Sequence, residues 1–429
     1  MTPQRKLPVR YSIVLMALLI NMVCYTDRVC IAVAGPEMRK DFQLNQTQMG
    51  LVFSIFSLSY FLGQTPWGML ADRLGSRGIV SLAIAGWSFF TALTGAAWNF
   101  VSLILVRFTF GAMESAFSPS IAAAFNRWVP VNERSTAFGA FLGDGRLSAS
   151  LTPPVAAFLM LRYGWRATFV LFGITGLLAS AVWYRWYRNS PGEHPSVSPA
   201  ELQAIGVPDS GSGTTPAAAP KWRSLICSSR LWCLLAAAFG STFMWQFYIT
   251  WFPTYLREHR GLSVAESSFY ASIPFLTGVG ATWAGGFLTD LIGRRTDARF
   301  ARTVIGMVSL TAGVVLMSFG IWCPQTGLAA LSMGLAAGAI DLYLGAAWSS
   351  ATDIGGGTAA GLMNAASNCA GFVSPTLMGW VLQKFNDWDS MLLLSVGTTG
   401  VAAILWPFVN PRDGRQSYQS IARAWMVRT

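Results

Sequence analysis

Four ionisable residues lie inside two long apolar stretches of the first half of the chain. Asp27 and Arg28 are neighbours in residues 11–35, and Arg107 and Glu114 are seven residues apart in a later stretch. A charge in hydrocarbon is costly unless it is paired or serves a function, so these residues indicate a functional site. Their types suit a polar cavity that binds an anion and exchanges protons.

The two arginines are the candidate anion-binding residues. Arginine carries a permanent charge and a planar fork that binds a carboxylate through two hydrogen bonds, and we rank Arg28 first and Arg107 second. Asp27 and Glu114 are the candidate proton-coupling residues, because occupancy of a nearby anion site would change their protonation. Arg107 and Glu114 share a helix face, so an alternative is that they form a buried structural ion pair.

Two tyrosines and a group of residues in the second half are further candidates for substrate binding. Tyr25 lies three residues before Arg28 and shares its helix face, and Tyr60 lies midway along the second apolar stretch. Their hydroxyl groups suit a substrate, although packing or a place at the membrane interface explains a tyrosine equally well. A polar wall opposite Arg28 would be formed by Trp348, Asn364 and Asn368.

The composition is that of a membrane protein with several crossings. Hydrophobic residues make up 53% of the 429 residues and charged residues only 11%. At roughly 20 residues per crossing, we predict twelve membrane-spanning helices and an all-α fold. They begin near Tyr11, Gly50, Ile79, Val101, Ala137, Ala167, Leu231, Ser267, Thr303, Gly327, Gly355 and Met391.

The basic residues predict how the chain is oriented in the lipid bilayer. Most Lys and Arg fall in the loops that lie on one side when both termini are cytoplasmic, as the positive-inside rule requires. The net charge of +11 is therefore explained by topology, and no basic and aromatic patch supports nucleic-acid binding. We expect an integral protein of the bacterial cytoplasmic (inner) membrane.

A polar interruption divides the chain into two similar parts. Residues 189–221 are rich in Pro, Ser, Gly, Thr and Ala. We predict an amino-terminal six-helix bundle over residues 1–188, a cytoplasmic linker over 189–229 and a carboxy-terminal six-helix bundle over 230–429. An internal repeat supports two pseudo-symmetric halves, since the Gly68–Asp72 spacing recurs at Gly286–Asp290, at an offset of 290 − 72 = 218 residues.

This repeated loop pattern resembles the signature of the major facilitator superfamily, in which basic residues follow the Gly and Asp. The resemblance implies two halves of six crossings each. It also implies a conformational latch at the cytoplasmic face, formed here by Gly68, Asp72, Arg73 and Asp290. The alternative for these residues is a tight turn with a solvated Asp.

A narrower resemblance is to the anion:cation symporter branch of that superfamily, which includes carriers of sugar acids and other carboxylates. The motifs that carry it are Tyr25 to Arg28, Arg107 to Glu114, Trp128 to Pro130, Glu133-Arg134, Gly164 to Arg166, Trp251 to Leu256, and Asn364, Asn368 and Pro375. The resemblance implies proton-coupled transport of a small organic anion by alternating access. An exchanger or exporter that works without proton coupling is the alternative within this fold.

One stretch departs from the pattern of that branch. Asp144 and Arg146 add two charges to the fifth predicted helix, where relatives place uncharged residues. Arg146 would bind a second carboxylate and favour diacids or bulkier acids, or else the two would neutralise each other locally. Asp341, in the tenth predicted helix, is a weaker candidate of the same kind.

The sequence gives no indication of an enzyme, a cofactor or a metal site. Its two histidines, His194 and His259, lie in predicted loops, and neither a phosphate-binding glycine loop nor a nucleophile–base constellation is present. A membrane-embedded sensor or enzyme is thus a remote alternative. The expected partners are the solute, protons and lipid, and we expect a monomer.

Overall fold

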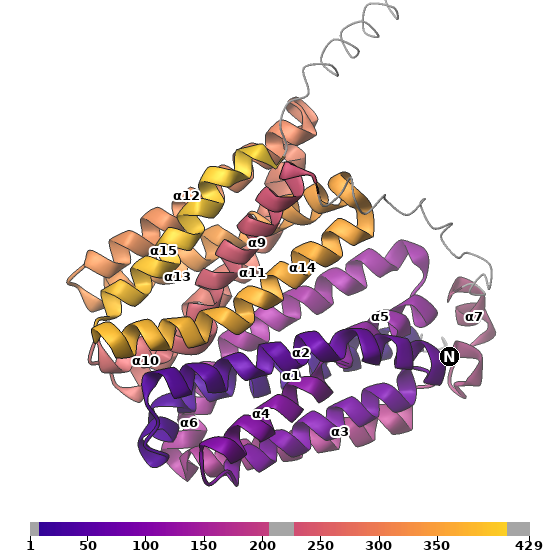
Figure 1. Ribbon diagram of the computed structural model, residues 1–429. Coiled ribbons are helices and arrows are strands. Elements are labelled where there is room, and N and C mark those ends of the chain that lie inside the picture. Colours follow the sequence, from indigo (N-terminus) through magenta and orange to yellow (C-terminus); the bar gives the residue numbers. More distant parts are fainter. Residues whose placement is uncertain (1–7, 206–226, 410–429) are drawn as a thin grey trace, which may run out of the picture.

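The computed structural model describes residues 8–205 and 227–409, apart from some side chains inside its helices. The regular elements of these ranges are helices that lie in two groups side by side (Figure 1). The first group contains α1 (Val9–Asp41), α2 (Gln46–Leu74), α3 (Ser76–Gly95), α4 (Phe100–Glu114), α5 (Phe117–Trp128) and α6 (Val131–Trp186).

The second group begins after η1 (Pro191–Glu193) and α7 (Pro199–Ile205), which lie beside the first turns of α1. Its elements are α9 (Ser229–Gln246), η2 (Phe247–Trp251), α10 (Phe252–Glu258), α11 (Val264–Arg295), α12 (Ala298–Trp322), α13 (Thr326–Asp341), α14 (Leu344–Phe385), α15 (Trp388–Leu405) and η3 (Trp406–Phe408).

The helices match the predicted crossings in position. Within the described residues, eight segments are long and apolar enough to span a bilayer. One of them, Thr136–Trp186, has 51 residues and accommodates two crossings, because about 20 residues suffice for one. The remaining predicted crossings fall on α2, α11 and α14.

Local breaks in the helices shape the interior. A break of two residues separates α4 from α5 just after Glu114, and Pro119, which has no backbone N–H, follows it. A break of the same length follows Asp341 between α13 and α14. The π-helical turn η2 lies directly before Pro253, and such turns often mark functional sites. Each break thus places polar groups inside the apolar fold.

The two groups are joined by polar contacts at one end, which we call the far end because α7 and the start of α1 lie at the opposite, near end (Figure 1). Arg257 pairs with Glu37 at 2.7 Å, and Arg39 pairs with Glu258 at 3.0 Å, which links α1 to α10. These four residues are the far-end ion pairs. Deeper along the same seam, the hydroxyl groups of Ser54 on α2 and Thr376 on α14 lie 2.8 Å apart. Contacts of α1 with α10 and of α2 with α14 therefore close this end.

The first part of the predicted linker is ordered at the near end. The backbone N–H of Arg10 donates to Glu201 of α7 at 2.9 Å. The ring of His194 lies 5.8 Å from that of Trp128 and 5.0 Å from that of Trp186. Burial, with a contribution from nearby positive charge, lowers the pKa of His194 below 6.5. The imidazole is therefore neutral at pH 7 and packs as an aromatic ring.

Gly164 makes the turn inside α6 that separates its two crossings. Its φ of 80° and ψ of 162° lie in a region that is essentially restricted to glycine. The sequence places this turn in a loop between the predicted fifth and sixth helices, so the prediction of two crossings agrees with the backbone.

We predict that Gly164→Ala lowers the free energy of unfolding by about 1–3 kcal/mol, because a Cβ there strains the backbone. No atom lies within 4 Å of the Cβ position at Gly164 or at Gly139, which is on the same helix with an ordinary φ. Gly139→Ala is therefore the matched control and should not destabilise the protein. Thermal unfolding in detergent measures both, and equal midpoints for the two variants would contradict the assignment of strain.

Candidate functional site

Arg28 lies in an aromatic cage and is paired with a buried carboxylate. Its Nε donates to Glu114 Oε1 at 3.1 Å, and its guanidinium makes a second contact with the same oxygen. The guanidinium carbon lies 5.0 Å from the ring centres of Tyr25 and Phe56 and 5.1 Å from that of Tyr60. Both predicted tyrosines therefore contact Arg28.

Arg107 is a buried cation without a polar partner among the described residues. Only 2% of it is exposed, and its Nε is buried and makes no hydrogen bond. Its guanidinium carbon lies 4.4 Å from the ring centre of Phe110 and 5.4 Å from that of Phe56. The alternative of an ion pair between Arg107 and Glu114 is wrong for this conformation, since Glu114 pairs with Arg28. Glu114 and Asp27 attract Arg107 electrostatically, but neither forms a salt bridge with it among the described residues, which leaves its guanidinium able to bind a ligand.

A small pocket, here the central pocket, lies between the two groups of helices and has a volume of about 160 Å³. The first half contributes Arg28, Tyr60 and Arg107, and the second half contributes Gln246 and Asn368. This volume is below the roughly 300–1,000 Å³ of sites for drug-sized ligands. The pocket suits a small anion that meets two arginines on one side and amides on the other.

A second space, the wide cavity, borders the central pocket at Arg28 and Ile249, which line both. Its volume is about 790 Å³, and it extends toward the near end, where Thr136 and Gly286 line it. Among the predicted residues, those lining the wide cavity are Tyr25, Arg28, Arg146 and Trp348. A solute therefore has room to approach Arg28 from the near end, whereas the far end is closed.

Asp27 lies behind Arg28 and lines neither space. It is fully buried, and neither carboxylate oxygen has a hydrogen-bond partner in the part of the chain that the structure describes. The side chains of Thr91 and Trp87 on α3 face it, but neither has the geometry of a hydrogen bond. Asp27 and Arg28 thus project in different directions, and the positive charge that acts on Asp27 is Arg107, which forms no salt bridge with it among the described residues.

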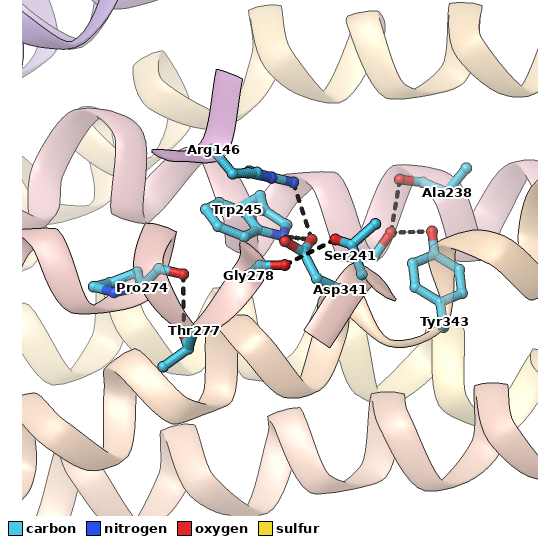
Figure 2. A network of polar contacts seen from close by, with 10 residues as sticks. Arg146, Ala238, Ser241, Trp245, Pro274, Thr277, Gly278, Asp341 and Tyr343 are labelled. Carbon is cyan, nitrogen blue, oxygen red and sulfur yellow. Dashed lines mark hydrogen bonds and ion pairs between the residues drawn. The ribbon is translucent and has the colours of Figure 1, made fainter. Parts of the chain in front are cut away.

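Arg146 pairs across the two groups of helices with Asp341, as Figure 2 shows. Its Nη2 donates to Asp341 Oδ1 at 3.0 Å, and Trp245 Nε1 donates to the same oxygen at 2.7 Å. The guanidinium carbon of Arg146 also lies over the ring of Trp245, 3.9 Å from the ring centre. Asp144 instead accepts a hydrogen bond from Asn21 at 3.2 Å. The alternative of a local Asp144–Arg146 pair is therefore wrong.

Of the remaining predicted residues, Trp348 and Asn368 each line one of the two spaces, and Asn364 lines neither. Trp348 is 48% exposed in the wide cavity, and Asn368 lines the central pocket. Asn364 is exposed and lines neither space, and its backbone carbonyl accepts from the side chain of Asn368 at 2.9 Å. Its predicted role in the polar wall has no support from this conformation.

The side chains of the predicted latch, Gly68, Asp72, Arg73 and Asp290, lie outside the described residues. Sequence reasoning did not name Gln246 and Trp245, which the structure places at the central pocket and beside Asp341. Asp341 ends α13 as Glu114 ends α4, a likeness that the structure shows and the sequence repeat does not.

Comparison with known proteins gives a family and a fold. The sequence profile of the Major Facilitator Superfamily matches residues 17–355. A probable sulfoacetate transporter of Cupriavidus necator is 31% identical over 412 residues, which cover 95% of each chain. A probable galactarate/D-glucarate transporter of Bacillus subtilis is 30% identical, with 94% of this chain and 91% of that protein covered. A hexuronate transporter of Bacillus subtilis is 29% identical, with 96% of both covered.

Solved structures share the fold at low sequence identity. The crystal structure of a bacterial homolog to the human lysosomal transporter Spinster has a TM-score of 0.78 at 20% identity and covers 94% of this chain and 97% of that one. A D-xylose-proton symporter has a TM-score of 0.72 at 16% identity and covers 94% and 98%. The predicted all-α membrane fold and the resemblance to the superfamily are confirmed, and the relatives are transporters rather than enzymes.

We predict opposite effects on stability for two substitutions at this site. Arg107→Met removes a buried cation that makes no hydrogen bond or salt bridge among the described residues, and it should raise the unfolding midpoint because the cost of desolvating the charge is removed. Arg28→Met is the matched comparison: it leaves Glu114 buried without its cation and should destabilise by about 3–5 kcal/mol. Unfolding midpoints of the two purified variants test this, and a loss of stability in both would show that Arg107 has a structural partner.

Proposed function

The chain belongs to the Major Facilitator Superfamily, and we propose that it carries a small organic anion, a carboxylate or sugar acid, across the membrane together with protons. The observation that carries this proposal is Arg107, which makes no hydrogen bond or salt bridge among the described residues and lines a pocket between the two halves next to Arg28. A buried cation without a salt-bridge partner is costly, and an anionic substrate removes that cost. The names of the relatives, which are carriers of organic anions, support the same class of substrate.

The carboxylates beside the arginines supply the proposed proton coupling. Glu114 shares Arg28 with an incoming anion, so an anion that binds Arg28 weakens its hold on Glu114. A buried carboxylate that loses its cation is stabilised by taking up a proton. Asp27, which has no hydrogen-bond partner, is the second candidate. Anion and proton then enter together, without covalent chemistry.

Alternating access would move the two bundles, residues 1–188 and 230–429, about the central pocket. The far-end ion pairs close one side, and the wide cavity opens toward the other. With both termini in the cytoplasm, as the basic loops predict, this conformation faces inward. We place the carrier, as a monomer, in the bacterial inner membrane, and Gly68, Asp72, Arg73 and Asp290 remain the proposed latch of the outward-facing state.

Transport by purified protein in liposomes tests the coupling. We predict that Arg28→Ala and Arg107→Ala abolish binding of an organic acid, because no other group replaces their charge in the central pocket. Asp27→Asn and Glu114→Gln should retain counter-flow of labelled substrate but lose uphill accumulation under an inward pH gradient. Arg162→Gln, at an exposed arginine that lines neither space, is the control and should transport as the unmodified protein does.

A proton-independent exchanger gives a different pattern. In that case counter-flow is rapid, a pH gradient changes nothing, and both carboxyl variants behave as the unmodified protein. Full gradient-driven uptake by Asp27→Asn and Glu114→Gln would reject the proton assignment while leaving the anion site intact.

A cross-link tests the proposed motion. The Ser54 and Thr376 hydroxyl groups are in contact, so the pair Ser54→Cys and Thr376→Cys should form a disulfide that keeps the far end closed. We predict that oxidation stops transport and that a reductant restores it, because the far end must open in each cycle. Each single variant controls for the native cysteines. Unchanged transport by the cross-linked protein would contradict rocking of the bundles about this seam.

A further inference from the structure

Two arginine–carboxylate pairs occupy equivalent places in the two halves. The 15-residue α4 ends at Glu114 and the 16-residue α13 ends at Asp341, and each is followed by a break of two residues. Both acids are fully buried. In each, one oxygen accepts from an arginine and the other has no partner. The second half therefore repeats the buried, arginine-paired carboxylate that we assign to proton binding in the first.

The two pairs differ in what they connect. Arg28 and Glu114 both belong to the first half, whereas Arg146 of α6 reaches Asp341 of the second half (Figure 2). The side chain of Arg146 is 24% exposed and lines the wide cavity, while Asp341 is inaccessible. A solute in the cavity thus has access to the arginine and competes with Asp341 for it.

Arg146 lies on the same path as Arg28. The Tyr25 ring contacts the Arg28 guanidinium on one side, and its Cε2 lies 2.5 Å from where a Cβ of Gly145 would stand. The central pocket and the wide cavity meet at Arg28 and Ile249. A short solute that lies along this path meets Arg107 and Arg28 at one end and Arg146 at the other.

We propose that Arg146 is a second anion-binding residue with Asp341 as its exchangeable counter-ion, so that the protein selects acids with two anionic groups. This inference rests on the proposed function. The first anionic group binds at Arg107 and Arg28, and the second displaces Asp341 from Arg146. When Asp341 leaves Arg146, this cation needs another negative charge beside it. A solute with one anionic group has used that group at Arg107 and Arg28, so it cannot replace Asp341.

Displacement of Asp341 from Arg146 affects both the protonation of Asp341 and the contact between the two bundles. Asp341 keeps the hydrogen bond from Trp245 after Arg146 leaves, but it has no cation, so it takes up a proton from solution. The same step breaks a direct ion pair between the two halves. Binding of a dianion is in this way linked to one further proton and to release of the halves from each other.

The experiment compares D-glucarate with D-gluconate, which share a six-carbon chain and differ by one carboxylate. Affinities are measured by calorimetry on the purified full-length protein and its variants. The unmodified protein should bind D-glucarate more tightly. Arg146→Gln should lower the ratio of the two affinities roughly tenfold to a hundredfold, the value of a lost charge-assisted bond pair. Arg162→Gln, an exposed position on the same helix, should leave the ratio unchanged.

Two more variants separate binding from a structural role. Asp341→Asn should keep the preference for D-glucarate but reduce proton uptake by one per bound dianion, measured by calorimetry in buffers of different ionisation enthalpy. If Arg146→Gln does not fold, Arg146→Lys retains the charge and should lower the ratio less than tenfold.

The outcomes distinguish this inference from the proposed function. If both acids bind and the ratio of their affinities is the same in Arg146→Gln as in the unmodified protein, the role of Arg146 is wrong. The proposed anion carrier is not affected by that result. If the unmodified protein binds D-gluconate, D-glucarate and sulfoacetate no more than a neutral sugar, the proposed anion carrier itself is wrong. Unaltered proton uptake in Asp341→Asn would overturn the counter-ion exchange.

Discussion

The cost of an uncompensated charge in hydrocarbon governs the interior of this protein. Arg28 and Arg146 each form a salt bridge with a carboxylate, whereas Asp27 and Arg107 attract each other without a salt bridge or hydrogen bond among the described residues. Because an ionised group without a partner is so unfavourable there, a bound anion or a bound proton changes the balance directly. The polar network is therefore a set of competing partners rather than a fixed scaffold.

Interruptions of the helices bring these partners into position. Glu114 and Asp341 lie at the last residue of a helix, next to a break, and η2 alters the path of the segment that carries Gln246 and Ile249 into the central pocket. Backbone groups freed by such breaks are tolerated at membrane depth when they line a cavity. Of the irregular segments, η2 lies where the two halves face each other, since Ile249 and Thr250 line the central pocket.

The sequence predicts the fold and the arginines but not the pairing of the charges. Apolar stretches and the repeated glycine–aspartate spacing suffice for the class of fold, since each crossing is a local property. The face shared by Arg107 and Glu114 suggested an ion pair, yet Glu114 meets Arg28, 86 residues away. Asp341 meets Arg146 at a separation of 195 residues. Periodicity within one helix contains no information about the rotation of a neighbouring helix, so these partners required the structure.

The far-end ion pairs carry a consequence for the environment of the protein. Glu37, Arg39, Arg257 and Glu258 have side chains between 22% and 36% exposed, so mobile ions reach them. The Debye length falls from about 10 Å at 0.1 M salt to about 3 Å at 1 M, which weakens half-exposed pairs far more than buried ones. Salinity on that side of the membrane would accordingly bias the resting population of conformers, while the chemistry of the interior stays the same.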